Sequence, residues 1–505
     1  MPEVRAQAEH DSLPTFLQTN LSPDQRARMG LMSFNQWPWT TAALIETAVA
    51  AHQVGSDVTV AFWCDHTPLR DSGWTTSRRI ARLTGSHPID ESARALIQAA
   101  AVDDGAFASP PLGKRHRSDL PPLPEPLTRS AIRQLTYRGS EMGRSILQVH
   151  PDFNTPIRDD YVWPRRWIKK ALQSYGWVFD QTVELIRQRN LTSLVVFNGR
   201  FAHDRAAAAA AESLGLKVLY YDYGGLHTYF DLTLTDLHDW DDLQRRMSVM
   251  WDSWGPDRQT IARDWFANRE NRSEAGMDVF LGLQQPEVLP DLPTDHQLVV
   301  FFSSSGDEIA ELDLDWSAYF NSQEEALRTL AEVCHHLPAT TLIVRTHPHM
   351  RLKPQDDRDR WVAAVESIGN NIHVEPESPI DSYALMRKAD RVITYGSTSG
   401  IEAAFRGTPT AVIGPSAYQR LGCVTPIHTV EGLKRWLTSK PDIHPDKALP
   451  YGLMMQRRGF NREWLTQTEA GELFHGNKGL NEASPLARKL SHRLGSVTTK
   501  WLTAR

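Results

Sequence analysis

The chain has 505 residues and a formal charge of −6, with 41% hydrophobic and 23% charged residues. This is an ordinary globular composition, so wholesale disorder and fibrous repeats are excluded. The mild acidity argues against a dedicated nucleic-acid binder, which usually carries a basic stripe. The three cysteines lie far apart in the sequence, which argues against a disulfide framework and against a structural zinc site.

The N-terminal residues carry no basic stretch followed by an apolar one, so no signal peptide is expected. No part of the chain approaches the length of apolar sequence that a transmembrane helix needs. We therefore expect a cytoplasmic protein, with peripheral association at the inner face of the membrane as the alternative to a freely soluble one.

Strand and helix patterns alternate through the first half of the chain. After an N-terminal extension at 1–28, the expected elements are strands at 30–34, 57–63, 191–197 and 217–221 and helices at 40–51, 163–189 and 204–214. Thr40 or Thr41 is the expected N-cap of the first of these helices. Strand–helix–strand units imply a parallel sheet. We therefore expect a Rossmann-like domain over 29–283, with a Pro-rich excursion near 108–127.

A second series of elements follows the Pro-rich segment 284–295, which is the expected linker. Its elements are strands at 297–302, 341–345, 372–375, 391–395 and 410–413 and helices at 322–335, 358–368, 382–388 and 401–406. They predict a second Rossmann-like domain at 296–440, followed at 441–505 by helices that cross back to the first domain. The predicted fold class is α/β, with two doubly wound domains facing a central cleft at the carboxyl ends of the strands.

The strongest functional motif leads from a strand through a loop of small residues into a helix. Two glycines allow close backbone approach and three hydroxyl side chains supply donors; these residues are Gly396, Ser397, Thr398, Ser399 and Gly400. The pattern is typical of a phosphate cradle, but it lacks the Gly-Lys-Ser/Thr of a Walker A loop. Glu402, one turn into the helix, is a candidate for binding ribose hydroxyls. The alternative is a plain capped helix.

Two earlier strands also end in polar residues. Arg345 and His347 follow one strand, where Pro348 favours an extended conformation for His347. These side chains are suited to neutralising or protonating a leaving phosphate. A further strand ends in a serine-rich turn, whose candidate donor-binding residues are Ser304, Ser305 and Glu308. A polar turn with a helix cap is the equally weighted alternative for this last segment.

In the first domain, polar and aromatic residues gather at the predicted strand ends. Candidates for the acceptor side are Trp37, Trp39, Asn198 and Arg200, and candidates for a general base are Asp204 and Asp222. The tryptophans are suited to stacking on sugars, with core packing as the alternative. Each acid is otherwise interpreted as a helix cap or a turn residue. Short acidic runs at 236–242 and 313–315 are interpreted as solvated faces rather than metal sites.

Residues 190–440 resemble the capsule-polysaccharide glycosyltransferases of the Kdo-transferase type. They are also similar, more distantly, to bacterial sialyltransferases and teichoic-acid polyol-phosphate polymerases. The resemblance is carried by Thr346–Pro348, Tyr395–Ala404, Gly407–Pro409, Ala411–Gly414 and Tyr418.

The resemblance implies a GT-B fold and an inverting, metal-independent glycosyltransferase without a cofactor. It implies that His347 assists departure of the donor phosphate, that Ser397–Ser399 bind this phosphate, and that an acid of the first domain is the base. The implied donor is a nucleotide-sugar, such as CMP-linked Kdo, and the acceptor is a glycan, lipid-linked or protein-linked hydroxyl. Two alternatives remain: a CDP-polyol phosphotransferase or sugar-nucleotide epimerase on the same fold, and a non-catalytic nucleotide-sugar-binding protein.

Overall fold

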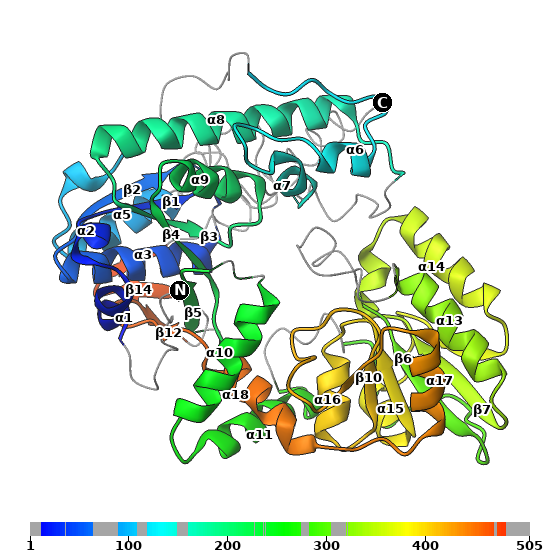
Figure 1. The fold of residues 1–505 in the computed structure, drawn as a ribbon. Helices are drawn as coiled ribbons and strands as arrows, with labels where there is room; N and C mark the ends of the chain where they lie inside the picture. The colour runs from blue at the N-terminus through cyan, green and yellow to red at the C-terminus, as the bar shows by residue number, and fades with distance from the viewer. Residues whose placement is uncertain are drawn as a thin grey trace. The chain divides into compact units, whose positions relative to one another are not determined.

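The computed structural model describes residues 12–35, 37–63, 89–108, 119–148, 160–226, 228–235, 237, 239–273, 282–304, 320, 322–468 and 472–480. The chain forms two compact units, drawn in Figure 1. Unit 1 comprises Met1–Leu237 and Arg457–Arg505, and unit 2 comprises His238–Gln456. The boundaries therefore differ from the predicted linker at 284–295 and the predicted domain end at 440. The two helices that follow residue 238 pack within unit 2, which is why the break comes earlier.

Unit 1 contains a six-stranded sheet with the order β12-β5-β4-β3-β1-β2. Its strands are β1 (Arg28–Ser33), β2 (Asp57–Phe62), β3 (Ser193–Phe197), β4 (Lys217–Tyr223), β5 (Tyr229–Thr233) and β12 (Phe460–Asn461). The four strands from β2 to β4 are parallel, as predicted, whereas β5 and β12 pair antiparallel at one edge and were not predicted.

Helices cover both faces of the unit 1 sheet. They are α1 (Leu13–Asn20), α2 (Pro23–Arg26), α3 (Pro38–Gln53), α5 (Ile89–Ala99), α6 (Arg129–Arg133), α7 (Met142–Gln148), α8 (Arg165–Arg189) and α9 (Ala202–Ser213), with the 3-10 helix η1 (Asp104–Ala106). Alternate residues of β3 enter opposite cores. Leu194 and Val196 pack with α8 and α9, while Val195 and Phe197 pack with α1, α3 and α5. This period-two alternation between two buried faces is what a doubly wound sheet requires.

Two local expectations at the N-terminus were wrong. Part of the predicted extension is folded, because Ser12 caps α1 and Phe16 and Leu17 of α1 enter the core. Helix α3 begins at Pro38, whose ring presets the helical φ. Its N-cap is Trp37 rather than a threonine, and the Thr40 and Thr41 hydroxyls instead donate to the Trp37 carbonyl at 2.8 and 3.0 Å.

The C-terminal part of the chain adds strands to unit 1, where only helices were predicted. Residues 458–465, which we call the return segment, include β12. They are followed by a small antiparallel sheet of β13 (Thr466–Gln467), β14 (Leu473–His475) and β15 (Lys478–Gly479). Strands this short have no periodicity that sequence inspection can detect.

Unit 2 contains a fully parallel six-stranded sheet with the order β11-β10-β9-β6-β7-β8. Its strands are β6 (Gln297–Phe302), β7 (Thr340–Arg345), β8 (Asn371–Val374), β9 (Arg391–Thr394), β10 (Thr410–Val412) and β11 (Thr425–Pro426). Counted from β6, this is the 3-2-1-4-5-6 order of the dinucleotide-binding fold, whose strand order reverses between β6 and β9. The predicted α/β class with two Rossmann-like units is therefore confirmed.

The helices of unit 2 are α10 (Trp240–Ser253), α11 (Arg258–Glu270), α13 (Gln323–His335), α14 (Gln355–Ser367), α15 (Ser382–Lys388), α16 (Ser399–Phe405), α17 (Val430–Thr438) and α18 (Leu449–Arg457), with 3-10 helices η3 (Pro348–Leu352) and η4 (Pro445–Ala448). Helices pack on both faces of the sheet, whereas α10 packs with α11 and α18 in a separate core. Val299 and Phe301 of β6 enter the core under α13, and Val300 and Phe302 enter the core under α15.

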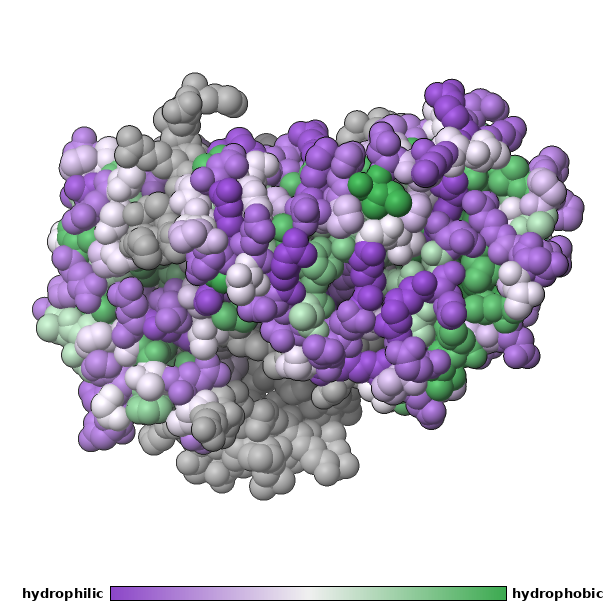
Figure 2. Space-filling view, turned by 90° about the horizontal axis from the view of Figure 1, so that it is seen from below, coloured by the Kyte–Doolittle hydropathy of each residue, from purple (hydrophilic) through white to green (hydrophobic). Residues whose placement is uncertain are grey.

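The exposed apolar residues are dispersed. On the face drawn in Figure 2, hydrophobic residues form small separate groups among hydrophilic ones, an arrangement that is normal for a globular surface. Within the described ranges, no helix is long and apolar enough to cross a membrane.

The return segment approaches β5 so closely that it needs glycine at position 459. Gly459 has φ +96°, and a Cβ there would lie 2.2 Å from the Phe230 carbonyl oxygen. Gly215 also has positive φ, at +76°, but a Cβ there would meet nothing within 4 Å. We expect Gly215→Ala to cost only about 1 kcal/mol of stability, from its backbone conformation. Gly459→Ala should cost roughly 3 kcal/mol or more, because the segment must also move away.

Urea unfolding midpoints of the two variants and the wild type measure this difference. Equal midpoints for the two variants would contradict the importance of the contact with β5.

Candidate functional site

Three of the predicted motifs emerge from one edge of the unit 2 sheet. Phe302, the last residue of β6, pairs with Arg345 at the end of β7 and with Thr394 at the end of β9. The three strands therefore end level with one another, and the segments that begin at residues 303, 346 and 395 leave side by side. This is the point at which the strand order reverses, where doubly wound sheets bind their ligands.

The segment Gly396–Ser399, which we call the hydroxyl loop, is half-exposed between buried neighbours. The Ser397 N–H donates to Thr394 Oγ1 at 2.9 Å, and the Ser397 and Ser399 hydroxyls lie 3.3 Å apart. Thr398 is the N-cap of α16, but its side chain does not cap the helix. The Gly400 N–H already donates to the Ser397 carbonyl at 3.0 Å. The loop therefore presents hydroxyls more than free helix N–H groups.

The glycines of this motif serve the fold itself. Gly396 has φ +81°, and a Cβ there would lie 2.4 Å from the Pro415 carbonyl oxygen. Gly400 is buried in the first turn of α16, where a Cβ would collide with the Tyr418 hydroxyl. That hydroxyl donates to the Ser397 carbonyl at 2.5 Å. Tyr418 thus fixes the backbone of the hydroxyl loop from beneath.

His347 lies at the start of the loop after β7 and is half-buried. Its backbone N–H donates to the Ser303 hydroxyl at 2.8 Å, which joins the loops after β6 and β7. Its ring Nδ1 accepts the His349 N–H at 3.2 Å. A neutral imidazole that accepts at Nδ1 carries its proton on Nε2. His347 therefore has a donor at Nε2, as a residue that assists a departing phosphate requires.

A buried network that sequence inspection missed supports the His347 loop. Trp361 Nε1–H donates to Thr346 Oγ1 at 2.8 Å, and this hydroxyl lies 2.9 Å from His373 Nε2. The Thr346 hydroxyl, which accepts from Trp361, has its own proton to donate to His373 when Nε2 of that ring is unprotonated. Burial lowers the pKa of His373, which keeps the ring neutral and able to accept.

Arg345 is not placed for the direct donor contact that was predicted. Its side chain is 1% exposed, with Nη1 donating to the Glu375 carbonyl at 2.5 Å and Nε donating to the Ser382 hydroxyl at 3.3 Å. Its Nη2 has no hydrogen-bond acceptor within the part of the chain that the structure describes. Burial lowers the pKa of Arg345 to about 10, so the group stays charged at neutral pH. It can act on an anion by its field rather than by contact.

Glu402 also differs from its predicted role. It is buried in α16 and forms an ion pair with Arg269 of α11. The sequence places Glu402 one turn into the helix but does not say which face it lies on. The carboxylate is thus occupied within unit 2 and joins two helices, which differs from the predicted contact with ribose.

The remaining predicted donor residues lie after β6. The Ser304 N–H donates to Gln323 Oε1 at 2.5 Å, and the Ser304 carbonyl accepts from Gln323 Nε2 at 3.3 Å. Gln323, the first residue of α13, thereby fixes the start of this loop. Ser305 and Glu308 lie outside the described residues.

In unit 1, Asn198 and Asp222 meet at the ends of adjacent strands. Asn198 follows β3 with φ +51°, and its Nδ2 donates to Asp222 Oδ2. The Tyr223 N–H donates to Asp222 Oδ1 at 2.7 Å. Burial raises the pKa of Asp222, although these donors and the charges of Arg200 and Arg458 act in the opposite direction. A carboxylate with a raised pKa is a stronger base when ionised.

The two predicted base candidates have different surroundings. Asp204 is 2% exposed and lies in the first turn of α9. Asp222 lies at the carboxyl end of β4 and is half-exposed. Only Asp222 combines a strand-end position with access to solvent.

The two predicted tryptophans form a stacked aromatic group with Tyr223, the residue that follows Asp222 in β4 and extends to the other face of the sheet. Trp37 and Trp39 are half-buried and stack with ring centroids 5.9 Å apart, and Trp39 stacks on Tyr223 at 3.4 Å. Tyr223 is 47% exposed. We call these three residues the aromatic platform. Arg200 lies near its edge, with its guanidinium 4.9 Å from the centre of the Phe201 ring.

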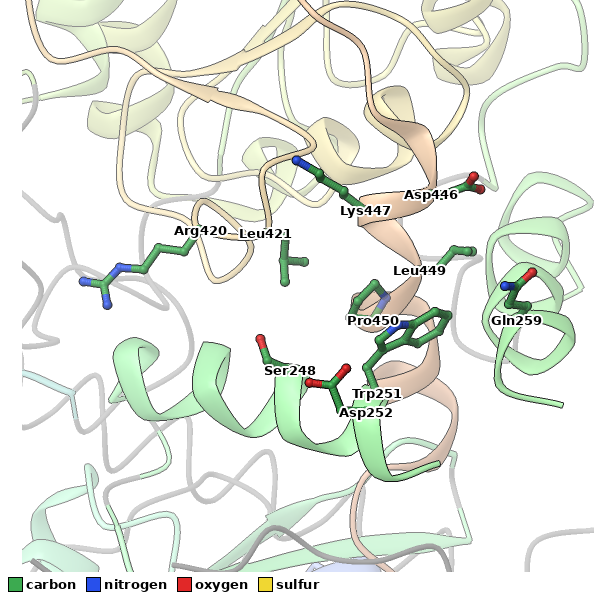
Figure 3. Close-up of a pocket in the computed structure, with 10 residues that line it drawn as sticks. All are labelled: Ser248, Trp251, Asp252, Gln259, Arg420, Leu421, Asp446, Lys447, Leu449 and Pro450. Atoms are coloured by element: carbon green, nitrogen blue, oxygen red, sulfur yellow. The ribbon is translucent and has the colours of Figure 1, made fainter. Parts of the chain in front are cut away.

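Unit 2 also has a cavity of about 450 Å³ away from the predicted motifs. Figure 3 shows it between α10 and the loop after β10, with the start of α18 as a further wall. Its lining residues are Ser248, Trp251, Asp252, Gln259, Arg420, Leu421, Asp446, Lys447, Leu449 and Pro450. Two of its charges are paired, Arg420 with Asp241 and Asp446 with Arg263. None of the predicted site residues lines it.

Within the described residues, no three His, Cys, Asp or Glu side chains gather as a metal site would require. His347 and His349, with ring centroids 6.4 Å apart, are joined through the bond to His347 Nδ1. Metal independence remains a prediction.

Residues 313–442 match the family model of capsule polysaccharide biosynthesis proteins. The matched segment contains the His347 loop and the hydroxyl loop, and the predicted resemblance to these proteins is confirmed there. No curated protein matches the chain.

Among solved structures, the chain is similar to two transferases of KpsC from Thermosulfurimonas dismutans. The beta Kdo 2,4 transferase is 13% identical, with 52% of this chain and 79% of that chain covered and a TM-score of 0.37. The beta Kdo 2,7 transferase is 13% identical, with 63% of this chain and 89% of that chain covered and a TM-score of 0.35. UDP-GlcNAc 2-epimerase from Neisseria meningitidis, bound to UDP-GlcNAc, is 8% identical, with 94% and 99% covered and a TM-score of 0.28.

The Thr346 network yields a stability prediction. Thr346→Val removes the hydrogen bonds to the buried Trp361 Nε1–H and to the half-buried His373 ring, which should cost roughly 2 kcal/mol of stability. Thr341→Val, in the strand that precedes Thr346, is a matched control, because its hydroxyl bonds the exposed His296 at 2.8 Å. The control should cost less than about 0.5 kcal/mol. Denaturant midpoints of the two variants measure the difference.

The cost of Thr346→Val should depend on pH. Because the folded-state pKa of His373 lies below its unfolded value, its contribution is complete above about pH 6.5 and is lost as the pH falls through the lowered value. The difference in unfolding free energy between wild type and Thr346→Val should therefore become smaller in acid. A difference in unfolding free energy that is constant from neutral pH to pH 4 would contradict the assignment of His373 as the acceptor.

Proposed function

We propose, from the match of residues 313–442 to capsule polysaccharide biosynthesis proteins, that this protein is a glycosyltransferase of capsule polysaccharide synthesis. Unit 2 binds a nucleotide-sugar donor, and unit 1 supplies the base for a hydroxyl of a glycan, lipid-linked or protein-linked acceptor. Transfer proceeds with inversion at the anomeric carbon and without a metal ion. A CMP-linked acidic sugar such as Kdo is the donor that the motif resemblance favours.

One observation carries the donor side of this proposal. The matched segment contains two loops, those of His347 and of the hydroxyl residues, that leave level strand ends at the reversal of the unit 2 sheet. Hydroxyl donors and an imidazole Nε2–H suit a diphosphate or monophosphate that gains charge as it leaves. The buried charge of Arg345 behind the His347 loop favours the same anion.

The acceptor side is supported by Asp222 and the aromatic platform. Ring faces of tryptophan and tyrosine suit the apolar faces of sugars. Asp222 combines a raised pKa with access from solvent, as a base near neutral pH requires.

In the proposed reaction, the acceptor oxygen forms a bond to the anomeric carbon as the bond from that carbon to the phosphate oxygen breaks. The proton of the acceptor hydroxyl passes to the Asp222 carboxylate. The electron pair of the breaking bond stays on the phosphate, where His347 Nε2–H and the hydroxyl loop stabilise it. Only groups that interact more strongly with the departing phosphate than with the bound donor accelerate the step.

The donor and the role of His347 are tested together. Thermal unfolding is measured with CMP, CDP, UDP and GDP, and we expect one nucleotide to raise the transition temperature, because it binds only the native state. The matching sugar donor is then offered with an oligosaccharide acceptor to wild type, His347→Ala and His349→Ala. His347→Ala should remain folded and lose at least about 100-fold in kcat. His349→Ala keeps the backbone N–H that bonds His347 and should stay close to wild type.

Other results would replace the proposal. Full activity in His347→Ala would remove its role. Conversion of the donor sugar without an acceptor would indicate an epimerase, turnover of a CDP-polyol would indicate a phosphotransferase, and binding without turnover would indicate a binding protein.

The base is tested by two isosteric substitutions that remove the ionisable group. Asp222→Asn should lower kcat by roughly 10²–10⁴-fold while leaving the nucleotide-induced thermal shift unchanged. Asp204→Asn should retain transfer, because that side chain is buried in α9. Single-turnover rates with both variants check this, and the opposite pattern would assign the base to Asp204.

A further inference from the structure

Asp222 has a buried carboxylate beside it that the sequence did not suggest. In the antiparallel pair of β4 and β5, Asp222 lies directly opposite Asp231. Directly opposed residues extend to the same face of a sheet, with Cβ atoms about 4.5–5.5 Å apart. Asp231 is 0% exposed. Two carboxylates this close repel each other when both are ionised, so one of them tends to hold a proton.

One cation contacts this strand pair from the return segment. Arg458 Nε lies 3.4 Å from Asp231 Oδ2, and Arg458 Nη2 donates to the Tyr223 carbonyl at 2.8 Å. Arg458 therefore joins the residue opposite Asp222 to the residue that follows it. A guanidinium can make both contacts at once because its donors point in several fixed directions.

The return segment is firmly held on the β4–β5 pair. The Gly225 N–H donates to the Arg458 carbonyl at 2.7 Å, and Gly459 packs against Phe230. Further along, the buried carboxylate of Glu46 in α3 accepts three successive backbone N–H groups. The donors are Glu463, Trp464 and Leu465, at 2.7 to 3.1 Å. The position of Arg458 is thus set by the backbone on both sides of it.

Two positive charges act on Asp222, those of Arg200 after β3 and of Arg458 in the return segment. Asp231 of β5 is the charged residue that lies directly opposite it in the sheet. The neighbouring groups Asn198 and Tyr223 donate hydrogen bonds to the carboxylate. Arg458 also contacts Asp231 in an ion pair.

We propose that Arg458 is a positioning residue that keeps Asp222 ionised, by neutralising Asp231 and holding the Tyr223 backbone whose N–H binds Asp222. This inference rests on the proposed function only in treating Asp222 as the base. Without Arg458, Asp231 loses its ion pair and Asp222 loses a nearby positive charge. Both changes favour protonation of Asp222.

The test compares Arg458→Gln with Arg457→Gln, which removes the same charge one residue earlier. Arg457 contacts the Tyr229 hydroxyl at 3.5 Å rather than either carboxylate. In Arg458→Gln, the acid limb of the pH profile of kcat should move upward by about one pH unit, with the rate recovering at high pH. Arg457→Gln should keep the wild-type profile. A loss of activity in Arg458→Gln that is equal at every pH would reduce Arg458 to a structural role and overturn the inference.

A direct titration separates this inference from the proposed function. Aspartate labelled with ¹³C at Cγ is titrated by NMR in wild type and in Arg458→Gln, with Asp222→Asn used to assign the signal. An upward displacement of the Asp222 titration supports the inference, even if Asp222→Asn retains transfer and the proposed base is wrong. An unchanged titration overturns the inference, whatever the activity. If the glutamine variant does not fold, the same titration is measured in Arg458→Lys, which keeps the positive charge. The Asp222 titration in Arg458→Lys should lie close to that of wild type. An upward displacement of about one pH unit in this variant would overturn the role of the charge.

Discussion

The candidate donor site depends on the register of one strand. β6 pairs in parallel with β7 on one side and β9 on the other, and its last residue, Phe302, pairs with the last residue of each. A shift of either neighbour by one residue would move its loop by about 3.3 Å and turn its side chains to the opposite face. The Ser303–His347 hydrogen bond across two of these loops is possible only in the observed register. The register is in turn fixed by burial, since β6 has Val300 and Phe302 in one core and Phe301 in the other.

In unit 1, buried carboxylates are stabilised by hydrogen bonds and ion pairs from the return segment. Glu46 is buried, but its carboxylate accepts hydrogen bonds from three backbone N–H groups of the return segment, which stabilise its charged form. Burial still raises the pKa of Glu46, against the opposing effect of these donors. Because the segment that satisfies Glu46 also carries Arg458, the same structure that stabilises one buried carboxylate delivers the cation for another pair. Stability and chemistry are thereby linked through the return segment.

The parts of the fold that were predicted are those with long apolar periodicity. The strand at 297–302 was predicted with its observed bounds, and the βαβ pattern from residue 30 onward gave the correct parallel pairing. The short strands β5, β11 and β12 were missed; β11 and β12 have two residues each, too few for any periodic signal. β12 pairs with β5, which lies more than 200 residues earlier in the chain, and no local sequence pattern predicts such a contact. The domain boundary was misplaced for a related reason, since proline content marks a flexible segment but not the unit on which the helices before it pack.

The candidate site was predicted to a similar extent, and its errors have a common physical cause. The sequence order placed His347 and the hydroxyl loop at strand ends, where the structure has them. For Arg345 and Glu402, spacing predicted the element but not the face, and both charged groups turned inward to partners on other elements. Asp204 and Asp222 could not be ranked from sequence because an acid at a helix start and an acid at a strand end look alike until burial is known.

The difference between these acids is what separates structural carboxylates from a chemically useful one. Glu402 and Glu46 are each almost fully matched by donors and are closed to solvent. Asp222 has donors on both oxygens, a second carboxylate opposite it, and partial access to solvent. A carboxylate beside a like charge is poised to take a proton. With Asp222 as the proposed base, its opposition to Asp231 suits this strand end to proton transfer, and Arg458 is the cation that we propose to set the pH at which transfer occurs.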